Sequence, residues 1–164
     1  MSKMLKQISQ DLKQAMKSKD AETTSVLRML IAAARNKEIG LRPAFAKTSA
    51  GRQDGQVELS DEQIIEVVSS EIKKRRDSVL AYEQGRRQDL ADKETREIEI
   101  LKKYLPAQLT DEELEKIIRE IIETRRGASV QKDFGKIMGQ TMVKIKGKAD
   151  GGKVGAIVKK LLGK

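Results

Sequence analysis

Apolar residues recur every three or four positions along most of this chain, which is the spacing of amphipathic helices. Two such stripes open the sequence: Leu5, Ile8, Leu12, Ala15 and Met16, followed by Val26, Leu27, Leu30, Ile31 and Ala34. We predict from them a helix over residues 2–18, capped by Ser2, and a helix over residues 21–39. The short break at Lys19 and Asp20 leaves a single kinked helix open as an alternative.

Two capping boxes mark the starts of further helices. Residues 60–63 (SDEQ) and 110–113 (TDEE) each place a hydroxyl at the cap and Gln or Glu three residues later. The apolar stripes that follow them are Ile64, Ile65, Val68, Ile72 and Val79, and Leu114, Ile117, Ile118, Ile121 and Ile122. The patterns predict one helix that runs to about Gln84 and another that ends at Gly127.

Three more helices are predicted from cap residues and the same spacing. They begin after Asp89, Ser129 and Asp150, and Pro106 ends the first of them. Their core candidates are Leu90, Ile98, Leu101 and Leu105; Val130, Phe134, Ile137, Met138 and Met142; and Val154, Ile157, Val158 and Leu161. No segment alternates strictly between apolar and polar residues, so we predict no strand.

These elements predict an all-α fold class with about seven helices. We expect a multihelical N-terminal domain over residues 1–106, followed by a small helical C-terminal domain over residues 107–164. The N-terminal domain contains the segment that fits the helical pattern least, the long loop over residues 40–59. Loops of this length are typical of mobile or functional segments. Mobility is one interpretation of it, and the other is anion binding by Arg42, Lys47 and Arg52.

The net charge of +9 is concentrated near the C-terminal end. Residues 125–164 contain eleven Lys and Arg against two Asp, whereas residues 1–124 contain 23 of each sign. This asymmetry favours a polyanionic partner, either a nucleic acid or an anionic membrane surface. A basic face that is simply solvated is the alternative.

The chain contains neither Cys nor His. This composition excludes thiol nucleophiles, Cys-based zinc sites and imidazole as a base or metal ligand. We predict no metal site and no cofactor. No apolar run has the length of a membrane span, and the first twenty residues lack the apolar core of a signal peptide. These residues are basic and amphipathic, but Asp11 and the scarcity of Arg argue against a transit peptide. We therefore expect a cytoplasmic protein that does not bind membranes.

Residues 147–154 (GKADGGKV) match the P-loop pattern up to its last position. A P-loop ends in a Ser or Thr that binds magnesium, and here Val154 stands in that place. P-loops also connect a strand to a helix within a parallel sheet, and no sheet is predicted. The pattern therefore argues against nucleotide hydrolysis.

An anion site does not require the P-loop fold. Lys144, Lys146 and Lys148 alternate along a segment that we interpret as extended, so their side chains would point the same way. With Asp150 as a cap, the backbone amides at the start of the next helix would attract anions. The candidate phosphate contacts are Lys136, Lys144, Lys146, Lys148, Lys153 and Lys160. A solvated loop before a capped helix is the alternative.

Two other stretches carry less specific signals. Gly135 and Gly139 lie four residues apart in a predicted helix, where each costs about 1 kcal/mol relative to Ala. Close packing of another backbone is the favoured reason, and approach of a phosphate backbone is the other. Residues 73–76 (KKRR) span most of a helical turn, so we interpret them as a solvated face, with Glu71 and Arg75 paired at i and i+4.

Four stretches of the chain resemble, in order, the motifs of the GatB/YqeY family. They are residues 73–78 (KKRRDS), 104–109 (YLPAQL), 135–139 (GKIMG) and 146–151 (KGKADG). The likeness covers nearly the whole chain. The region around residues 41–56 looks longer than the connection usual in the family, so no role of its basic residues is implied.

The resemblance implies kinship with the tail of the B subunit of the tRNA-dependent amidotransferase. In that family the tail is associated with tRNA binding, and the chemistry resides in other domains. It therefore implies a non-catalytic module that binds tRNA or another structured RNA. The alternatives are a part of a glutamine-dependent amidotransferase, a carbon–nitrogen ligase with glutamine as amide donor, or an adaptor that docks on an aminoacyl-tRNA synthetase or amidotransferase. Independent catalysis lacks an evident nucleophile and base in this composition.

Overall fold

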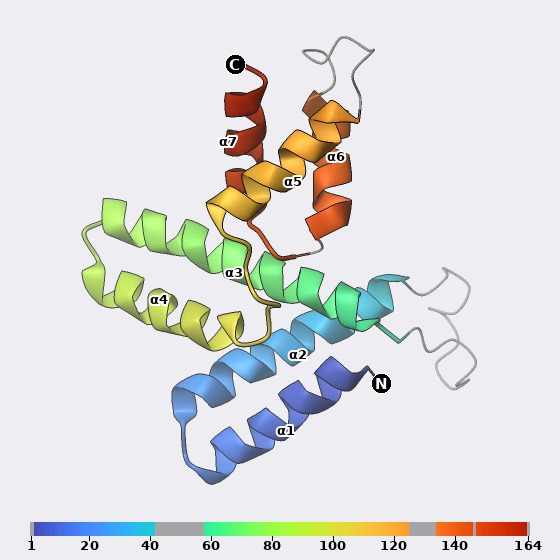
Figure 1. Cartoon of the computed structure of the whole chain (residues 1–164). Helices are drawn as coiled ribbons and strands as arrows, with labels where there is room; N and C mark the ends of the chain where they lie inside the picture. The colour runs from blue at the N-terminus through green and yellow to red at the C-terminus, as the bar shows by residue number, and fades with distance from the viewer. Residues whose placement is uncertain (1, 42–57, 125–133, 146, 164) are drawn as a thin grey trace. The chain divides into compact units, whose positions relative to one another are not determined.

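Seven α-helices and no strand form the part of the chain that the computed structural model describes, which is residues 2–41, 58–124, 134–145 and 147–163 (Figure 1). The helices are α1 (Lys3–Lys17), α2 (Ala21–Leu41), α3 (Asp61–Gln84), α4 (Gln88–Lys102), α5 (Asp111–Glu123), α6 (Phe134–Ile145) and α7 (Gly151–Leu161). The predicted all-α fold class is confirmed. No described helix combines the length and the apolar character that crossing a bilayer requires.

The chain divides into two compact units, Met1–Tyr104 and Leu105–Lys164. The predicted boundary at residue 106 lies two residues beyond this division. Separate folding of the two parts stays a prediction.

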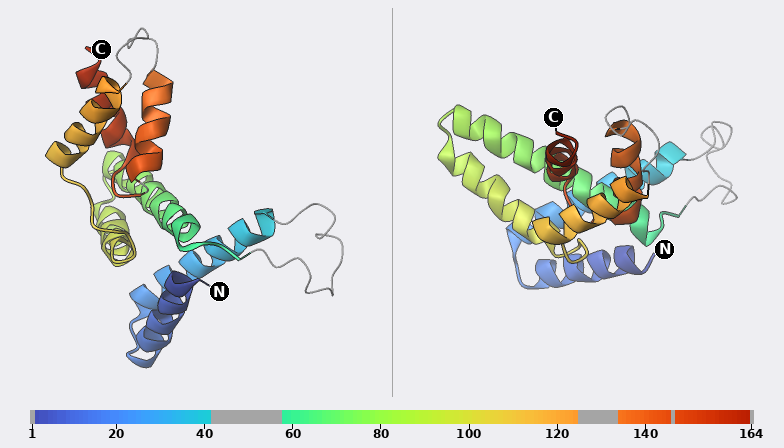
Figure 2. Two further views of the ribbon diagram at one scale, coloured as in Figure 1. Left: turned by 45° about the vertical axis from the view of Figure 1, so that its right-hand side comes forward. Right: turned by 45° about the horizontal axis from the view of Figure 1, so that its top comes forward.

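Two helical hairpins make up the N-terminal unit, α1 with α2 and α3 with α4 (Figures 1 and 2). Their core is aliphatic, and its fully buried members include Ile8, Val26, Leu27, Ile64 and Leu101. A complete break separates α1 from α2, so the kinked-helix alternative is wrong. Lys19 adopts a positive φ of 59°, and the side chain of Asp20 accepts a hydrogen bond of 3.0 Å from the amide of Thr23.

The predicted caps are confirmed at three of four positions in residues 2–124. Ser2 accepts a hydrogen bond from the amide of Leu5, and both capping boxes have their two reciprocal hydrogen bonds. Asp89 is not a cap, because α4 begins earlier, after Arg87. The Asp89 carboxylate instead accepts two hydrogen bonds from the guanidinium of Arg87, within the first turn.

The predicted loop over residues 40–59 begins later than expected, because helix α2 continues through Gly40 to Leu41. Leu59 belongs to no helix but is buried in the core. Residues 42–57, with Arg42, Lys47 and Arg52, lie outside the described part of the chain.

A buried ion cluster joins α3 to α4. Arg75 is only 5% exposed, and its guanidinium donates to a carboxylate oxygen of Glu71 at 3.1 Å and of Glu97 at 3.0 Å. The pairing of Glu71 with Arg75 is confirmed, but the interpretation of Arg75 as solvated is wrong. Arg75 follows Ile72 by three residues and Val68 by seven, so it continues the apolar face of α3 into the core.

Helices α5, α6 and α7 pack around a second aliphatic core in the C-terminal unit. Its buried members are Leu114, Ile118, Ile121, Ile137, Ile145, Val154, Val158 and Leu162. Met142, predicted to face inward, is exposed instead. The predicted helix end at Gly127, the cap at Ser129 and the core position Val130 lie outside the described residues.

Candidate nucleic-acid interface

The loop between α6 and α7 is held by residues from the segment that precedes α5. The side-chain amide of Gln108 donates to the carbonyl oxygens of Gly147 at 3.1 Å and of Pro106 at 3.0 Å. The amide of Leu109 donates to the carbonyl of Lys148 at 2.8 Å. Gly147 has a positive φ of 78°, a conformation that glycine adopts without steric cost. These contacts fix the backbone of the loop that carries Lys148.

Asp150 caps α7 as predicted, but it also occupies part of the proposed anion site. Its Oδ1 atom accepts a hydrogen bond of 2.8 Å from the amide of Gly152. A carboxylate at a helix N-terminus uses the amides and the helix dipole that would otherwise attract an anion. The start of α7 is therefore a capped helix, and an anion there would compete with the protein's own carboxylate.

The predicted extended segment before this loop is wrong. Thr141 through Ile145 continue α6, so Lys144 belongs to the last turn of a helix. The buried residues Ile137, Thr141 and Ile145 recur at the helical spacing of four, which outweighs the short alternation seen in the sequence. Lys146 lies outside the described residues. Lys144 and Lys148 therefore do not share a face as alternate residues of a strand.

Three of the predicted lysines lie next to acidic residues of α5. The Lys144 ammonium contacts the Glu120 carboxylate at 3.0 Å, and the Lys153 ammonium contacts the Asp111 carboxylate at 3.2 Å. Lys160 lies close enough to Glu115 to help lower the pKa of that carboxyl.

The pKa shifts agree with these contacts. A hydrogen bond from Lys144 lowers the pKa of Glu120 below its ordinary value. A hydrogen bond from Arg119 lowers the pKa of Glu115, with a smaller contribution from the charge of Lys160. The lysines are exposed, so the attraction is screened by solvent.

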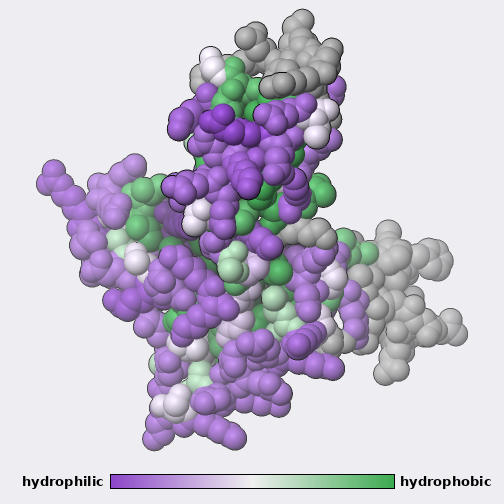
Figure 3. All heavy atoms as spheres, in the orientation of Figure 1, coloured by the Kyte–Doolittle hydropathy of each residue, from purple (hydrophilic) through white to green (hydrophobic). Residues whose placement is uncertain are grey.

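Charge is therefore distributed differently in the fold from its distribution along the chain. Residues 105–164 contain thirteen Lys and Arg against eight Asp and Glu, a net charge of +5. The C-terminal unit includes the acidic residues of α5, and two of them contact lysines that follow later in the sequence. Figure 3 shows hydrophilic side chains over α5 on the face that it draws.

The paired glycines of α6 do not pack against another backbone. A Cβ atom added to Gly135 or Gly139 would meet nothing within 4 Å, and both residues are exposed. The favoured explanation of close packing is therefore wrong for the described structure. Lys136 lies between them and is also exposed. This part of α6 therefore has accessible backbone at the two glycines and a positive charge beside it.

Sequence reasoning missed the contacts that organise this unit. It did not assign roles to Gln108 and Leu109, although both lie in one of the family-like motifs. No pattern of local spacing predicts the hydrogen bond from Gln108 to Gly147, because the two residues lie 39 positions apart in the chain. The sequence assigned the acids of α5 no role beyond the capping box at residues 110–113, because their lysine partners are distant in sequence.

We predict that Val154→Thr, which completes the P-loop pattern, does not create a nucleotide site. Val154 is fully buried in the core of the unit, so the new hydroxyl would face apolar side chains rather than solvent. We expect a loss of about 1–2 kcal/mol in the free energy of unfolding, measured by urea titration. Saturable binding of MgATP to this variant in isothermal titration calorimetry would contradict the prediction.

Comparison with known proteins identifies two kinds of relative. The chain is 27% identical over 141 residues to "Altered inheritance of mitochondria protein 41, mitochondrial" of Kluyveromyces lactis, covering 82% of this chain and 69% of that protein. The protein of the same name from Saccharomyces cerevisiae is 30% identical over 122 residues, or 71% of this chain and 59% of its own length.

The second kind of relative belongs to an amidotransferase. The chain is 45% identical over 78 residues to a subunit of the glutamyl-tRNA(Gln) amidotransferase of Sulfurisphaera tokodaii. The match covers 46% of this chain and 12% of that relative. It therefore concerns a small part of a much larger protein.

The predicted cytoplasmic location is contradicted by these relatives. Proteins matching most of the chain are named as mitochondrial, which points to mitochondria rather than the cytoplasm. The prediction rested on the absence of a membrane span and of a signal peptide, and on Asp11 and the scarcity of Arg as evidence against a transit peptide. Neither of the first two features distinguishes one aqueous compartment from another.

The family comparison covers nearly the whole chain. Residues 5–162 match the family model described as "Yqey-like protein", so the match includes all seven described helices except the start of α1. It agrees with the resemblance in the four sequence motifs. The chain belongs to the Yqey-like protein family.

Proposed function

We propose that the chain is a non-catalytic module that binds tRNA or a similarly structured RNA through its C-terminal unit. The observation that carries the proposal is the exposed stretch formed by Lys136 with Gly135 and Gly139, where a Cβ atom added to either glycine would meet nothing within 4 Å. Two features add to it: the net charge of +5 of the unit and the similarity to part of a tRNA amidotransferase.

The affinity would come from lysine contacts to phosphates rather than from stacking on bases. The whole chain contains two Phe and two Tyr, too few for an extended stacking platform. Tyr104 is mostly buried and donates a hydrogen bond of 2.8 Å to Asp11, so its ring belongs to the N-terminal core. Recognition would therefore depend on the shape and charge of a folded RNA.

The contribution of each lysine would depend on its surroundings. Lys148 is exposed, and Gln108 and Leu109 hold the loop that presents it. Lys144 and Lys153 must leave the carboxylates of Glu120 and Asp111 before they contact a phosphate. Since both ion pairs are exposed, the exchange costs on the order of 1 kcal/mol or less for each.

We expect Lys136→Ala with Lys148→Ala to weaken binding of unfractionated tRNA to the full chain by about tenfold at moderate salt. The slope of log K against log salt should become shallower by about 1 for each lysine that contacts a phosphate. Filter binding over a salt series measures both quantities. The matched control is Lys73→Ala with Lys93→Ala, two exposed lysines of the N-terminal unit, which should leave affinity and slope unchanged.

A gain of affinity provides a second readout of the same experiment. Glu120→Gln frees Lys144 from its carboxylate and removes a negative charge, so tRNA affinity should rise by about two- to threefold. Unchanged affinity in the double lysine variant would refute the site, and undetectable tRNA binding by the wild-type chain would refute the function.

A second candidate is an accessory part of a glutamine-dependent amidotransferase, a carbon–nitrogen ligase. The similarity to an amidotransferase component favours it, although the match covers 12% of that protein. On this hypothesis the chain alone releases no ammonia from glutamine and alters turnover only when a catalytic subunit is present. An ammonia assay with and without such a subunit distinguishes it from the RNA-binding module.

A further inference from the structure

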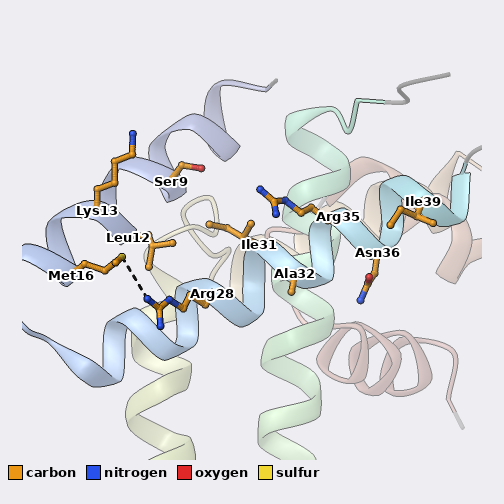
Figure 4. A pocket seen from close by; sticks show the side chains of 10 residues that line it. All are labelled: Ser9, Leu12, Lys13, Met16, Arg28, Ile31, Ala32, Arg35, Asn36 and Ile39. Carbon is orange, nitrogen blue, oxygen red and sulfur yellow. Dashed lines mark hydrogen bonds between the residues drawn. The ribbon is translucent and has the colours of Figure 1, made fainter. Parts of the chain in front are cut away.

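An open groove of about 540 Å³ lies between α1 and α2 in the N-terminal unit (Figure 4). Its apolar lining includes Leu12 and Met16 from α1 and Ile31 and Ile39 from α2. Leu12 and Ile31 point toward each other across the space between the two helices. The groove is part of neither the candidate RNA interface nor the buried ion cluster.

Helix α2 has a buried apolar face and a second face that combines apolar and cationic residues. Its buried residues are Val26, Leu27, Leu30 and Ala34, which pack in the core. The groove residues Arg28, Ile31, Arg35 and Ile39 recur at intervals of three and four along another side of the helix. At 100° per residue, the two sets lie roughly 130° apart. The groove residues therefore do not belong to the face of α2 that packs in the core.

The large apolar residues of the groove are only partly covered by the described residues. Met16 and Ile39 are each 50% exposed, although the side chains are large and apolar. Leu12, Met16 and Ile31 had the spacing of core residues in the sequence, yet none of them is fully buried. Clustered exposed apolar side chains at helical spacing are typical of a protein interaction surface.

The groove is also cationic. Lys13, Arg28 and Arg35 line it, and none of its described lining residues carries a carboxylate. Within the described residues none of the three forms an ion pair, and the guanidinium of Arg28 instead contacts the sulfur of Met16 at 3.8 Å. An occupant must therefore supply negative charge beside apolar side chains.

We propose that this groove binds an amphipathic helix of a partner protein that carries acidic residues beside its apolar face. Two adjacent helical stripes form a trough of the kind that receives a third helix, with anchors at i, i+3, i+4 and i+7. The lining of α2 from Arg28 to Ile39 extends about 16 Å, which corresponds to about three turns of the occupant.

Charge and polarity distinguish this occupant from others. A second copy of the chain would place one cationic groove against another, and the like charges would repel. An RNA would satisfy the cations but leave Leu12, Met16 and Ile31 facing water or phosphate. An acidic amphipathic helix matches both the apolar floor and the three cations.

The test uses the full chain and two fluorescent synthetic peptides of about 16 residues. Both peptides have Leu on one helical face, and the flanking positions are Glu in one peptide and Lys in the other. We expect the Glu peptide to bind saturably in fluorescence anisotropy, and about tenfold more tightly than the Lys peptide.

Arg28→Glu with Arg35→Glu should reverse this preference, so that the Lys peptide binds more tightly. Ile39→Asp should weaken both peptides by about tenfold, because it places a charge on the apolar floor. Lys73→Glu with Lys93→Glu, and Leu80→Asp, are the matched exposed controls outside the groove and should change neither affinity. Thermal melts followed by circular dichroism verify that each variant is folded.

Absence of saturable peptide binding, or a Glu preference that survives the double reversal, would overturn the proposal. It would also fail if groove variants abolish binding to tRNA or to phosphatidylglycerol vesicles while the peptides do not bind. Dissociation of a dimer by the groove variants, seen by sedimentation, would instead assign the groove to a second copy and overturn it as well.

Discussion

Arg75→Met is expected to lower the free energy of unfolding of the N-terminal unit by about 3 to 5 kcal/mol. The substitution leaves the carboxylates of Glu71 and Glu97 at the α3–α4 contact without the guanidinium that pairs with both. Glu71 keeps its contact with Lys74 at 2.7 Å, so Glu97 accounts for most of the loss. Urea unfolding followed by circular dichroism measures the change.

Two further variants distinguish the cost of leaving buried charges unpaired from the cost of losing an ion pair. Glu71→Leu and Glu97→Leu, added to Arg75→Met, should restore most of the stability, since a buried ion cluster and an apolar one of similar size are often nearly equal. Arg96→Ala breaks an exposed pair with Glu22 and should cost about 1 kcal/mol or less. A cost of Arg75→Met no greater than that of Arg96→Ala would contradict the prediction.

The same cluster makes a prediction about pH. Burial raises the pKa of Glu71, but hydrogen bonds from Lys74 and Arg75 outweigh it and hold the pKa below its ordinary value. The contribution of Glu71 to stability is therefore fully present above the pKa of the unfolded chain and is lost as pH falls through the folded value. In Arg75→Met only Lys74 opposes the effect of burial on Glu71, so the pKa of Glu71 should rise, and the difference between variant and wild type should shrink as pH falls through the unfolded and then the folded value of Glu71.

Ile118→Ala is expected to lower the free energy of unfolding of the C-terminal unit by about 3 kcal/mol. Ile118 is fully buried among the residues of α5, α6 and α7 that form this core. A unit of 60 residues has few kcal/mol in total, so the variant should unfold the unit at a fraction of the wild-type urea concentration.

The variant also tests whether the two parts of the chain fold separately. If they do, limited proteolysis of Ile118→Ala should digest residues 105–164 and leave a stable fragment of residues 1–104. Val143→Ala is the matched control in the same unit, because Val143 is 70% exposed and its loss should cost within about 0.5 kcal/mol. A single transition in which both parts unfold together would contradict separate folding.

Local pattern accounts for most of the secondary structure. Capping boxes and the apolar spacing involve residues three or four apart, and the energies of a helix and its cap depend on neighbours at that distance. The boxes at Ser60 and Thr110 were therefore predicted correctly. The same reasoning failed where two local patterns competed. The residues just before Ile145 show both a short alternation and the spacing of four that is typical of a helix, and they belong to α6.

The sequence by itself determined the all-α class, most helix starts and the aliphatic character of both cores. The tertiary structure decided which charges are paired, because Coulomb energy depends on distance in space rather than along the chain. It buried Arg75 between two glutamates, and it placed Lys144 and Lys153 beside acids of α5. It also decided which apolar residues are covered, since Leu12, Met16 and Ile31 line an open groove although their spacing predicted a core, whereas the other residues of the two stripes are buried.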